Sequence, residues 1–453
     1  MPRDPQVPQF FRTLRVKNVN QVGVLAAVLS VIARHGGSVG DIRTVQQSRT
    51  FMVRDIDIIM ETLEEFDALV VDLDSHEEST VVELRDEVLT AHLGGKIRVV
   101  SRAPIDTFAD LGRVYTPGVG EVCRRISEDA RLADNYTIIP NTCAIVSDGS
   151  AVLGLGNLGA TAAMPVLEGK AALLAHLAGV NAIPIALKSQ DPGDIVEAVA
   201  AISATFGVIQ LEDIASPKCF DVEPALQEKV DIAVFHDDQH GTAAVVLATL
   251  INACALTGLF IDELRVGQIG LGAAGLAIAR SVMHYTGNPV LGADRVPEPM
   301  DRLASWGGTP ATIDEIFARC DVVIATTGRP GLITPDMVRP GQLIFALSNP
   351  RPEIDAAEAL DAGARIAESG AAVNNLLCYP GACRGLLDTG ARRAPQEVFR
   401  AASEAIVAVT PPNQLLPSPL DRSVHRAVAR AVARAAMDHA VATREPPAGY
   451  FED

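Results

Sequence analysis

Aromatic residues are scarce in this chain of 453 residues, where Phe, Trp and Tyr together make up 4% and Trp occurs once. Hydrophobic residues still account for 48%, with abundant Ala, Val and Leu. This composition suits helices layered on a parallel sheet better than a sandwich of antiparallel sheets, so we expect an α/β fold. Because the length exceeds that of one ordinary hydrophobic core, we also expect two or three domains.

Positive charge is also in short supply, since the formal net charge is −18. This excess of acid argues against a nucleic-acid partner, because phosphate binding needs a basic surface. A small anionic substrate remains compatible with it, because a bound cation reverses the local field. We find no uncharged run of membrane-spanning length, and MPRDPQVPQF lacks the apolar segment of a signal peptide. We therefore expect neither membrane insertion nor secretion.

Cysteines are few and do not suggest disulfide pairing. The seven, at positions 123, 143, 219, 254, 320, 378 and 383, are odd in number and scattered through apolar segments. This pattern predicts reduced core residues of a cytoplasmic protein.

The first 88 residues alternate between strand and helix patterns. Strands are predicted at 10–18, 39–48, 50–60 and 80–87, with an apolar helix over 22–37 and an acid-rich helix within 61–78. This βαββαβ order resembles an ACT domain, a ferredoxin-like module that binds small effectors at a dimer interface. A dimerisation or packing module without a ligand is an equally open interpretation of residues 1–88.

Two apolar runs end in paired acids further along the chain. GVIQLED closes with Glu212 and Asp213, and VDIAVFHDD closes with Asp237 and Asp238. Four carboxylates at neighbouring strand ends would repel one another, so a divalent cation is expected among them. Oxygen ligands favour Mg²⁺ or Mn²⁺. Either pair alone would be interpreted as solvated loop acids. The flanking His236 and His240 are expected to play a structural or supporting role.

Tyr115 and Lys170 become candidate catalytic residues because the chain also contains these acid pairs. Tyr115 lies at a Pro-Gly turn in YTPGV, at the edge of a loop. Lys170, in LEGKA, is expected near the start of an apolar helix that Pro165 and Gly169 interrupt. A lysine near a helix N-terminus and a cation loses proton affinity, which suits a general base.

Glycine-rich loops occur twice, in different contexts. CAIVSDGSAVLGLGNLGA predicts a hairpin-like strand pair running into Gly154, Gly156 and Gly159, without the helix and acid of a dinucleotide site. The second loop has the full context of a preceding strand, a following helix and Asp294 about twenty residues on. Asp294 favours NAD over NADP, while Arg295 leaves this preference open. The predicted cofactor-binding residues of this loop are Gly270, Gly272, Ala273, Ala274 and Gly275.

Asparagines follow later strand patterns, and Ala-rich helices close the chain. Asn349 lies at the end of the strand pattern in GQLIFALSNP, and Asn374 and Asn375 lie in AAVNNLLCYPG. Beside a cofactor, such side chains could bind a substrate carboxylate or the nicotinamide ribose, although turn capping is the alternative. The helices after about residue 415 are expected to be packing elements.

The motifs YTPGV, AVLGLGNLG, LEGKA, LEDI, FHDDQHGT, GLGAAG, LSNP and NNLLCYPG occur in this order over roughly 300 residues. Their order resembles the malic enzyme family from about residue 90 to the end, and specifically its small bacterial type. Ala151 stands where larger members carry a substrate-binding Arg, and Cys378 and Tyr379 also depart from the family pattern.

The resemblance implies oxidative decarboxylation of L-malate to pyruvate and CO₂, with NAD (or NADP) and Mg²⁺ or Mn²⁺. It implies metal ligation by Glu212, Asp213 and Asp238. Lys170, tuned by Asp237, would be the general base, and Tyr115 would protonate C3 of enolpyruvate. Asn349 and Asn375 match positions at the substrate and nicotinamide, with Asn349 also touching the cofactor.

The expected domains are 1–88, a metal- and substrate-binding domain over 89–241 and a Rossmann-like NAD(P)-binding domain over 242–453, whose last helices pack back on the substrate domain. We expect a homodimer or a higher homo-oligomer. Two alternatives are a malolactic-type enzyme that releases lactate from the same site and a dinucleotide-binding metabolite sensor with an inactive site.

Overall fold

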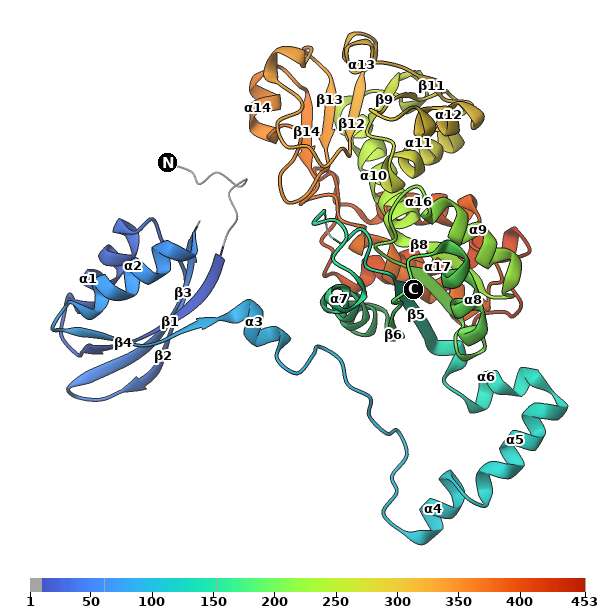
Figure 1. The fold of residues 1–453 in the computed structure, drawn as a ribbon, viewed down its shortest axis with the longest axis horizontal. Helices are drawn as coiled ribbons and strands as arrows, with labels where there is room; N and C mark the ends of the chain where they lie inside the picture. Colours follow the sequence, from blue (N-terminus) through green and yellow to red (C-terminus); the bar gives the residue numbers. More distant parts are fainter. Residues whose placement is uncertain (1–9, 61, 153, 453) are drawn as a thin grey trace. The chain divides into compact units, whose positions relative to one another are not determined.

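The computed structural model describes residues 10–60, 62–152 and 154–452. The chain divides into two compact units, Met1–Lys96 and Ile97–Asp453. Figure 1 labels the elements of both, and each unit is described by itself.

The first unit is a four-stranded antiparallel sheet covered by two helices. Its strands are β1 (Phe10–Val19), β2 (Ser38–Gln47), β3 (Phe51–Met60) and β4 (Ser79–Asp86), in the order β2-β3-β1-β4. Its helices are α1 (Val24–Arg34) and α2 (Leu63–Asp74), followed by the short α3 (Glu87–His92). Leu14, Ile56 and Phe66 are among the buried residues between the sheet and the helices. The predicted ferredoxin-like βαββαβ arrangement is confirmed, whereas the ACT assignment stays a prediction.

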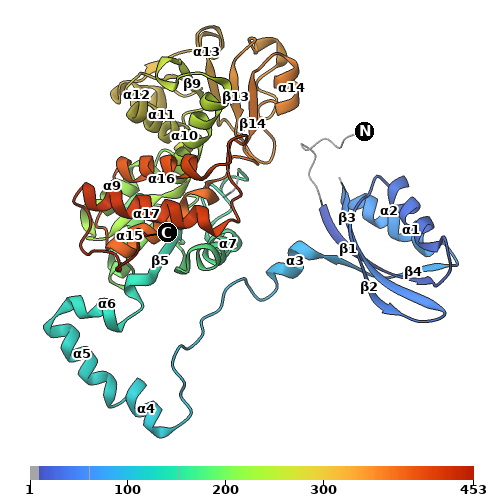
Figure 2. The same cartoon turned by 180° about the vertical axis from the view of Figure 1, so that it is seen from behind.

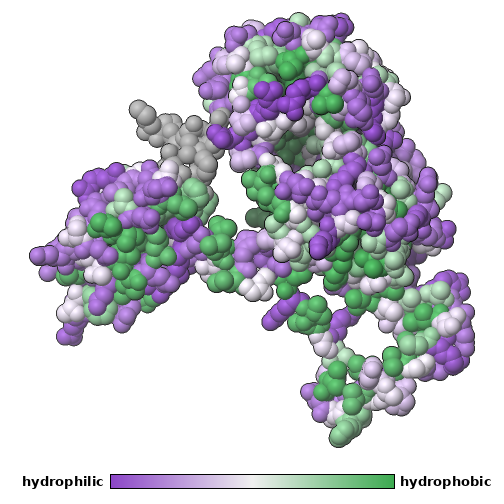
Figure 3. Space-filling model, viewed as in Figure 1, coloured by the Kyte–Doolittle hydropathy of each residue, from purple (hydrophilic) through white to green (hydrophobic). Residues whose placement is uncertain are grey.

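The second unit begins with a helical arm, which we define as residues 108–136. The arm contains α4 (Phe108–Val114), α5 (Gly118–Glu128), the 3₁₀ turn η1 (Ala130–Leu132) and α6 (Ala133–Tyr136). Neither α4 nor α5 contains a buried residue. Phe108 is 93% exposed and Tyr115 is 66% exposed, and Figure 3 shows apolar residues on the surface of the arm. Isolated helices of this length are marginal in water, so the arm needs a packing partner.

A parallel four-stranded sheet follows the arm, in the order β6-β5-β7-β8. Its strands are β5 (Thr142–Ser147), β6 (Asn181–Ala186), β7 (Val208–Leu211) and β8 (Ala233–His236). The helices that alternate with them are α7 (Ala160–Ala178), α8 (Pro192–Ile202), α9 (Cys219–Lys229) and α10 (Asp237–Thr257). All four residues of β7 and of β8 are buried, as expected for parallel strands covered on both faces.

Two local predictions were wrong in this region. The expected hairpin after β5 is absent from the described residues, because Val152 pairs with Gly156 only as an isolated bridge. Helix α7 is continuous through Pro165. A proline removes one backbone donor, and the packing of Leu167, Ala171 and Leu174 into the core outweighs that loss.

The dinucleotide-type sheet has six parallel strands in the order β11-β10-β9-β12-β13-β14. The strands are β9 (Val266–Ile269), β10 (Leu291–Ala293), β11 (Thr309–Pro310), β12 (Val322–Ala325), β13 (Leu343–Ala346) and β14 (Ile366–Ser369). The accompanying helices are α11 (Ala273–Thr286), α12 (Pro297–Ser305), α13 (Ile313–Arg319) and α14 (Ala356–Asp361). The predicted Rossmann-like arrangement is therefore confirmed.

The chain ends with α15 (Tyr379–Thr389), α16 (Gln396–Val409) and α17 (Arg422–Asp438). Helix α17 packs on α15, α16 and α7, and α7 lies in the predicted metal- and substrate-binding domain. The domain division at residue 241 itself stays a prediction. Six of the seven cysteines are buried and none forms a disulfide, while Cys123 is exposed.

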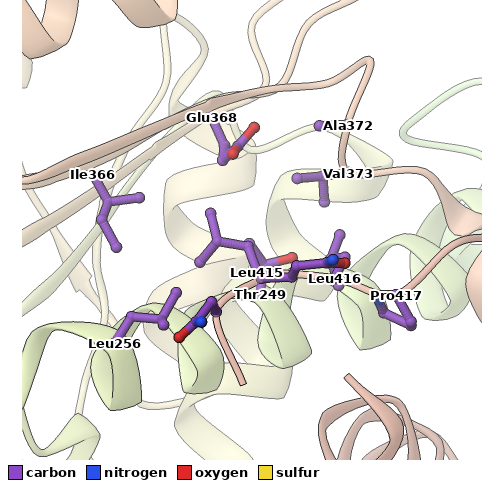
Figure 4. Close-up of a pocket in the computed structure, with 11 residues that line it drawn as sticks. Thr249, Leu256, Ile366, Glu368, Ala372, Val373, Leu415, Leu416 and Pro417 are labelled. Atoms are coloured by element: carbon purple, nitrogen blue, oxygen red, sulfur yellow. The ribbon is translucent and has the colours of Figure 1, made fainter. Parts of the chain in front are cut away.

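Helix α10 is central to the second unit. It is the one described helix long and apolar enough to cross a membrane, and 67% of that stretch is buried in the protein core. Behind it, a mainly apolar cavity of about 530 Å³ lies between α10, β14 and residues 413–417. Figure 4 shows Glu368 at the wall of this cavity, opposite Leu415 and Thr249. Burial raises the pKa of the Glu368 carboxyl.

Candidate active site

The two acid pairs meet at one edge of the four-stranded sheet. Strands β7 and β8 are parallel neighbours with Leu211 opposite His236, so Glu212 and Asp213 follow one strand where Asp237 and Asp238 follow the other. Ligand oxygens of Glu212, Asp213 and Asp238 lie within 4.8 Å of one another. The sequence-predicted trio is therefore brought together, with Asp237 outside it.

The backbone at Asp213 is held in an unusual conformation. Its φ is 54°, a left-handed value that costs a non-glycine residue roughly 1–3 kcal/mol. The Asp213 amide donates to Asp238 Oδ2 at 2.8 Å, and its carbonyl accepts from the Ala151 amide at 3.0 Å. These bonds stabilise the turn that directs the Asp213 side chain toward the cluster.

The chemistry of this cluster fits a divalent cation. Glu212 is 2% exposed and Asp213 is 4% exposed. Burial, and then repulsion from Asp238, raises the pKa of the Glu212 carboxyl well above its usual range. A cation among these three carboxylates, of which Glu212 and Asp213 are buried and Asp238 is partly exposed, relieves this repulsion, and an all-oxygen set suits Mg²⁺ or Mn²⁺.

Lys170 lies against the same carboxylates. Its ammonium forms an ion pair with Asp237, and Nζ lies 3.0 Å from Glu212 Oε1. Burial alone would lower the pKa of Lys170, but attraction to Asp237 and Glu212 raises it well above the usual value. Lys170 is the eleventh of the nineteen residues of α7, so the predicted position near the helix N-terminus was wrong. Its charge is controlled by carboxylates, because the dipole effect acts only within the first turn.

Asp237 is completely buried and lies at the first turn of α10. Burial raises its pKa to about 6, against the attraction of Lys170. A Cβ at Gly241 would lie 1.9 Å from Asp237 Oδ1 and 3.5 Å from the Asn375 Cβ. Glycine at 241 therefore makes room for both Asp237 and Asn375, which places Asn375 at the site.

The predicted Asn349 lies against the first glycine-rich loop. A Cβ at Gly154 would lie 2.8 Å from the Asn349 carbonyl oxygen, and one at Gly370 would lie 2.8 Å from Asn349 Nδ2. This loop therefore contacts the segment that carries Asn349.

Tyr115 is the predicted catalytic residue that the structure does not bring to Lys170. It caps the C-terminal end of α4 on the exposed arm, and its side chain has no described contact with the acid cluster.

The two histidines beside Asp237 differ in their contacts, and His236 Nδ1 lies 3.6 Å from Asp238 Oδ2. His240 Nε2 pairs with Glu223 Oε1 at 2.7 Å, and its ring stacks on Phe399 with centroids 4.7 Å apart. His236 is buried, which lowers its pKa. These contacts agree with the expected structural role.

Two groups near the site were missed as site residues. Tyr379 is 1% exposed, and its ring centroid lies 4.5 Å from Lys170 Nζ; its position four residues after Asn375 was the available signal. Asp148 is fully buried and forms an ion pair with Lys218, while Asp148 Oδ1 accepts from Ser150 Oγ at 2.6 Å. A charged residue at the end of the apolar strand β5 could have indicated this pair.

The second glycine-rich loop forms a separate pocket of about 520 Å³, lined by Gly270, Gly272, Asp294, Arg295 and Arg329 among others. A Cβ at Gly275 would lie 1.9 Å from the Gly270 carbonyl oxygen, so only glycine allows this close turn. Asp294 accepts from the Leu271 amide at 2.7 Å and from the Val296 amide at 2.9 Å. This geometry is that of a dinucleotide site, with the N-terminus of α11 available for a pyrophosphate.

A dinucleotide pocket in the same unit as an all-carboxylate cation cluster with an adjacent lysine defines a metal-dependent oxidoreductase architecture. Known proteins agree with this class. The family model "Malic enzyme, N-terminal domain" matches residues 94–193. NAD-dependent malic enzyme 1 of Bacillus subtilis (strain 168) is 47% identical over 434 residues, which cover 95% of this chain and 98% of that protein. The chain therefore belongs to the malic enzyme family.

Two further comparisons support this membership. The bifunctional malic/malolactic enzyme of the same organism is 39% identical over 79% of this chain and 94% of that protein. The crystal structure of malic enzyme from Pyrococcus horikoshii Ot3 superposes with a TM-score of 0.76 at 38% identity, over 81% of this chain and 94% of that chain.

Proposed function

We propose that this protein oxidatively decarboxylates L-malate to pyruvate and CO₂ while reducing NAD(P)⁺. The observation that carries the proposal is the ion pair of Lys170 with Asp237 directly beside the Glu212, Asp213 and Asp238 cluster. This arrangement provides a proton acceptor next to a cation site, as removal of a hydride and then of CO₂ from a 2-hydroxy acid requires.

Lys170 is the general base for the C2 hydroxyl proton, and Asp237 holds its amine in position. A divalent cation held by Glu212, Asp213 and Asp238 supplies a Lewis acid for the oxygens of the substrate. Held there, the cation would offset Glu212 and Asp238, two of the three carboxylates that raise the pKa of Lys170. The neutral amine that a base needs then becomes more accessible.

Asn375 and Asn349 bind the substrate and the nicotinamide side of the cofactor in this proposal. Their neighbours support it, since Asn375 lies against Gly241 and Asn349 against Gly154. We further propose that NAD⁺ is preferred, because the Asp294 carboxylate, fixed by two backbone amides, repels a 2′-phosphate.

Tyr115 protonates C3 of the enol intermediate, and its position on the arm supports a homodimer in which it serves the site of the partner subunit. Helices α4 and α5 contain no buried residue, so a second copy of this chain is the natural packing surface. Mixing the inactive variants Tyr115→Phe and Lys170→Ala tests the arrangement. Hybrid dimers recover activity if Tyr115 acts across the interface, because one site then has both native residues. Hybrids without activity would contradict it.

A steady-state assay with L-malate, crossing NAD⁺ and NADP⁺ with and without Mn²⁺, tests the function itself. Pyruvate and NADH in equal amounts, dependent on Mn²⁺, are expected. Lactate without net NADH would favour the malolactic alternative, and absent turnover would favour the sensor. We also propose that the ACT-like module binds a small-molecule effector and that the protein is cytoplasmic.

A further inference from the structure

A groove rich in arginine lies on the second unit, away from the residues of the proposed active site. It has a volume of about 360 Å³ and lies between the end of α7, helix α15 and helix α17, with Tyr450 at its rim. Figure 2 shows α17 in red beside α15 and α7. The charged residues in its lining are Arg384, Asp388, Arg422, Arg426 and Arg430.

The charge of this groove is strongly positive, although the whole chain has a net charge of −18. Its lining contains four arginines and one carboxylate, Asp388. Three of the arginines, at positions 422, 426 and 430, recur every four residues on α17 and so form one row along the helix. Like charges this close repel one another unless an anion compensates them.

The pairing of these arginines leaves positive charge available. Arg384 forms an ion pair with Asp388, and Arg430 donates to the Glu452 carbonyl oxygen. Arg422 donates only to His176 Nδ1, at 3.2 Å. Over residues 10–60, 62–152 and 154–452, no ion pair joins Arg422 or Arg426 to a carboxylate, although Arg426 helps to lower the pKa of the Asp421 helix cap.

A buried donor in the lining gives a second and independent indication. Arg384 Nε is buried and has no hydrogen-bond partner among the described residues. A buried donor without a partner is unfavourable, and an oxygen of a bound anion would satisfy it. A row of arginines on an open, solvated helix face would not explain this buried donor.

We propose that this groove binds a small metabolite anion that carries two or more negative charges on carboxylate or phosphate oxygens. Arg422 and Arg426 provide the unpaired charge, and Arg384 fixes the ligand at the floor. Its volume lies within the range of small-molecule sites, about 300–1,000 Å³. Two of the helices that form the groove, α7 and α15, also carry Lys170 and Tyr379. A ligand in the groove therefore contacts helices that position residues of the proposed active site.

Titration calorimetry of the full chain tests the proposal, with citrate as the carboxylate probe and pyrophosphate as the phosphate probe. Metals are first removed with EDTA, which is then dialysed away because it is itself a polycarboxylate. Saturating NAD⁺ occupies the dinucleotide pocket, and acetate at equal ionic strength serves as the monovalent comparison. The test variant is Arg422→Gln/Arg426→Gln. The matched control is Arg434→Gln, on the same row of α17, because Arg434 stacks on Phe451 and lies outside the groove lining.

The double variant is expected to bind citrate, pyrophosphate or both at least about ten-fold more weakly, since it loses two charge-assisted hydrogen-bond donors. The control is expected to match the unmodified protein, and the tighter probe identifies the ligand class. Equal affinity in both variants, or acetate binding as tightly as citrate and pyrophosphate, would overturn the proposal. A change of oligomeric state in the double variant alone, measured by sedimentation, would instead assign the groove to contact between copies.

Discussion

Replacing Lys170 with Met removes the ammonium that pairs with two buried carboxylates while nearly preserving its volume. Asp237 is completely buried and Glu212 is 2% exposed. Asp237 then loses its ion-pair partner, and Glu212 loses its ion pair but keeps the hydrogen bond from Gln210. Breaking a buried ion pair in this way costs about 3–5 kcal/mol. We expect the metal-free variant to be destabilised on this scale.

The loss of folding stability in the variant should depend on pH, because protonation of Asp237 removes the unpaired buried charge. In the unmodified protein the pKa of Asp237 is about 6, raised above the value in the unfolded chain, so stability falls as pH rises through about 6. Without Lys170 the carboxyl must stay protonated at still higher pH. Each pKa unit corresponds to about 1.4 kcal/mol, so the difference between variant and parent grows to about 3 kcal/mol at pH 8 and is small at pH 6.

Urea denaturation in EDTA at pH 6, 7 and 8 measures this difference, and a parallel series with Mn²⁺ should show a smaller loss because the cation gives the carboxylates a partner. Lys229→Met is the matched control. Lys229 pairs with Glu197 at the surface, where an ion pair contributes about 0–1 kcal/mol. A pH-independent loss at position 170, or an equal loss at position 229, would refute the reasoning.

Three other variants probe the metal site, the turn beside it and the cofactor pocket. Asp238→Asn should weaken Mn²⁺ binding at least about ten-fold, or 1.4 kcal/mol, in an equilibrium titration. Asp237→Asn should change the Mn²⁺ affinity little. The reverse order of the two effects would place Asp237 among the ligands. Gly241→Ala should lose about 1–3 kcal/mol of stability by overpacking against Asp237. Urea denaturation measures this loss, and an unchanged stability would contradict the clash. Asp294→Asn should raise the ratio of kcat/KM for NADP⁺ to that for NAD⁺ about ten-fold, and an unchanged ratio would remove Asp294 from cofactor choice.

Local sequence predicted many of the elements and the position of the acid pairs, although the hairpin after β5 and the break in α7 were wrong. Apolar runs of four residues ending in LED and HDD predicted parallel strands with carboxylates at one sheet edge, and β7 and β8 have this geometry. The glycine spacing at 270–275 likewise predicted its turn, because a Cβ at Gly275 would collide with the Gly270 carbonyl. The turn at 270–275 depends on residues close in the chain. The meeting of the two acid pairs follows from the alternation of strand and helix, which makes β7 and β8 parallel.

Only the tertiary structure decided what lies around Lys170. The lysine is in the middle of a helix that Pro165 does not interrupt, because core packing overrides a local helix preference. Its contact with Tyr379 joins positions more than two hundred residues apart. The approach of Arg384 to the arginine row of α17 likewise joins two helices, α15 and α17, that α16 separates in the chain. Sequence determined which charged residues the chain carries. Their pKa values and partners follow from burial and from contacts between distant segments, which exist only once the helices have packed.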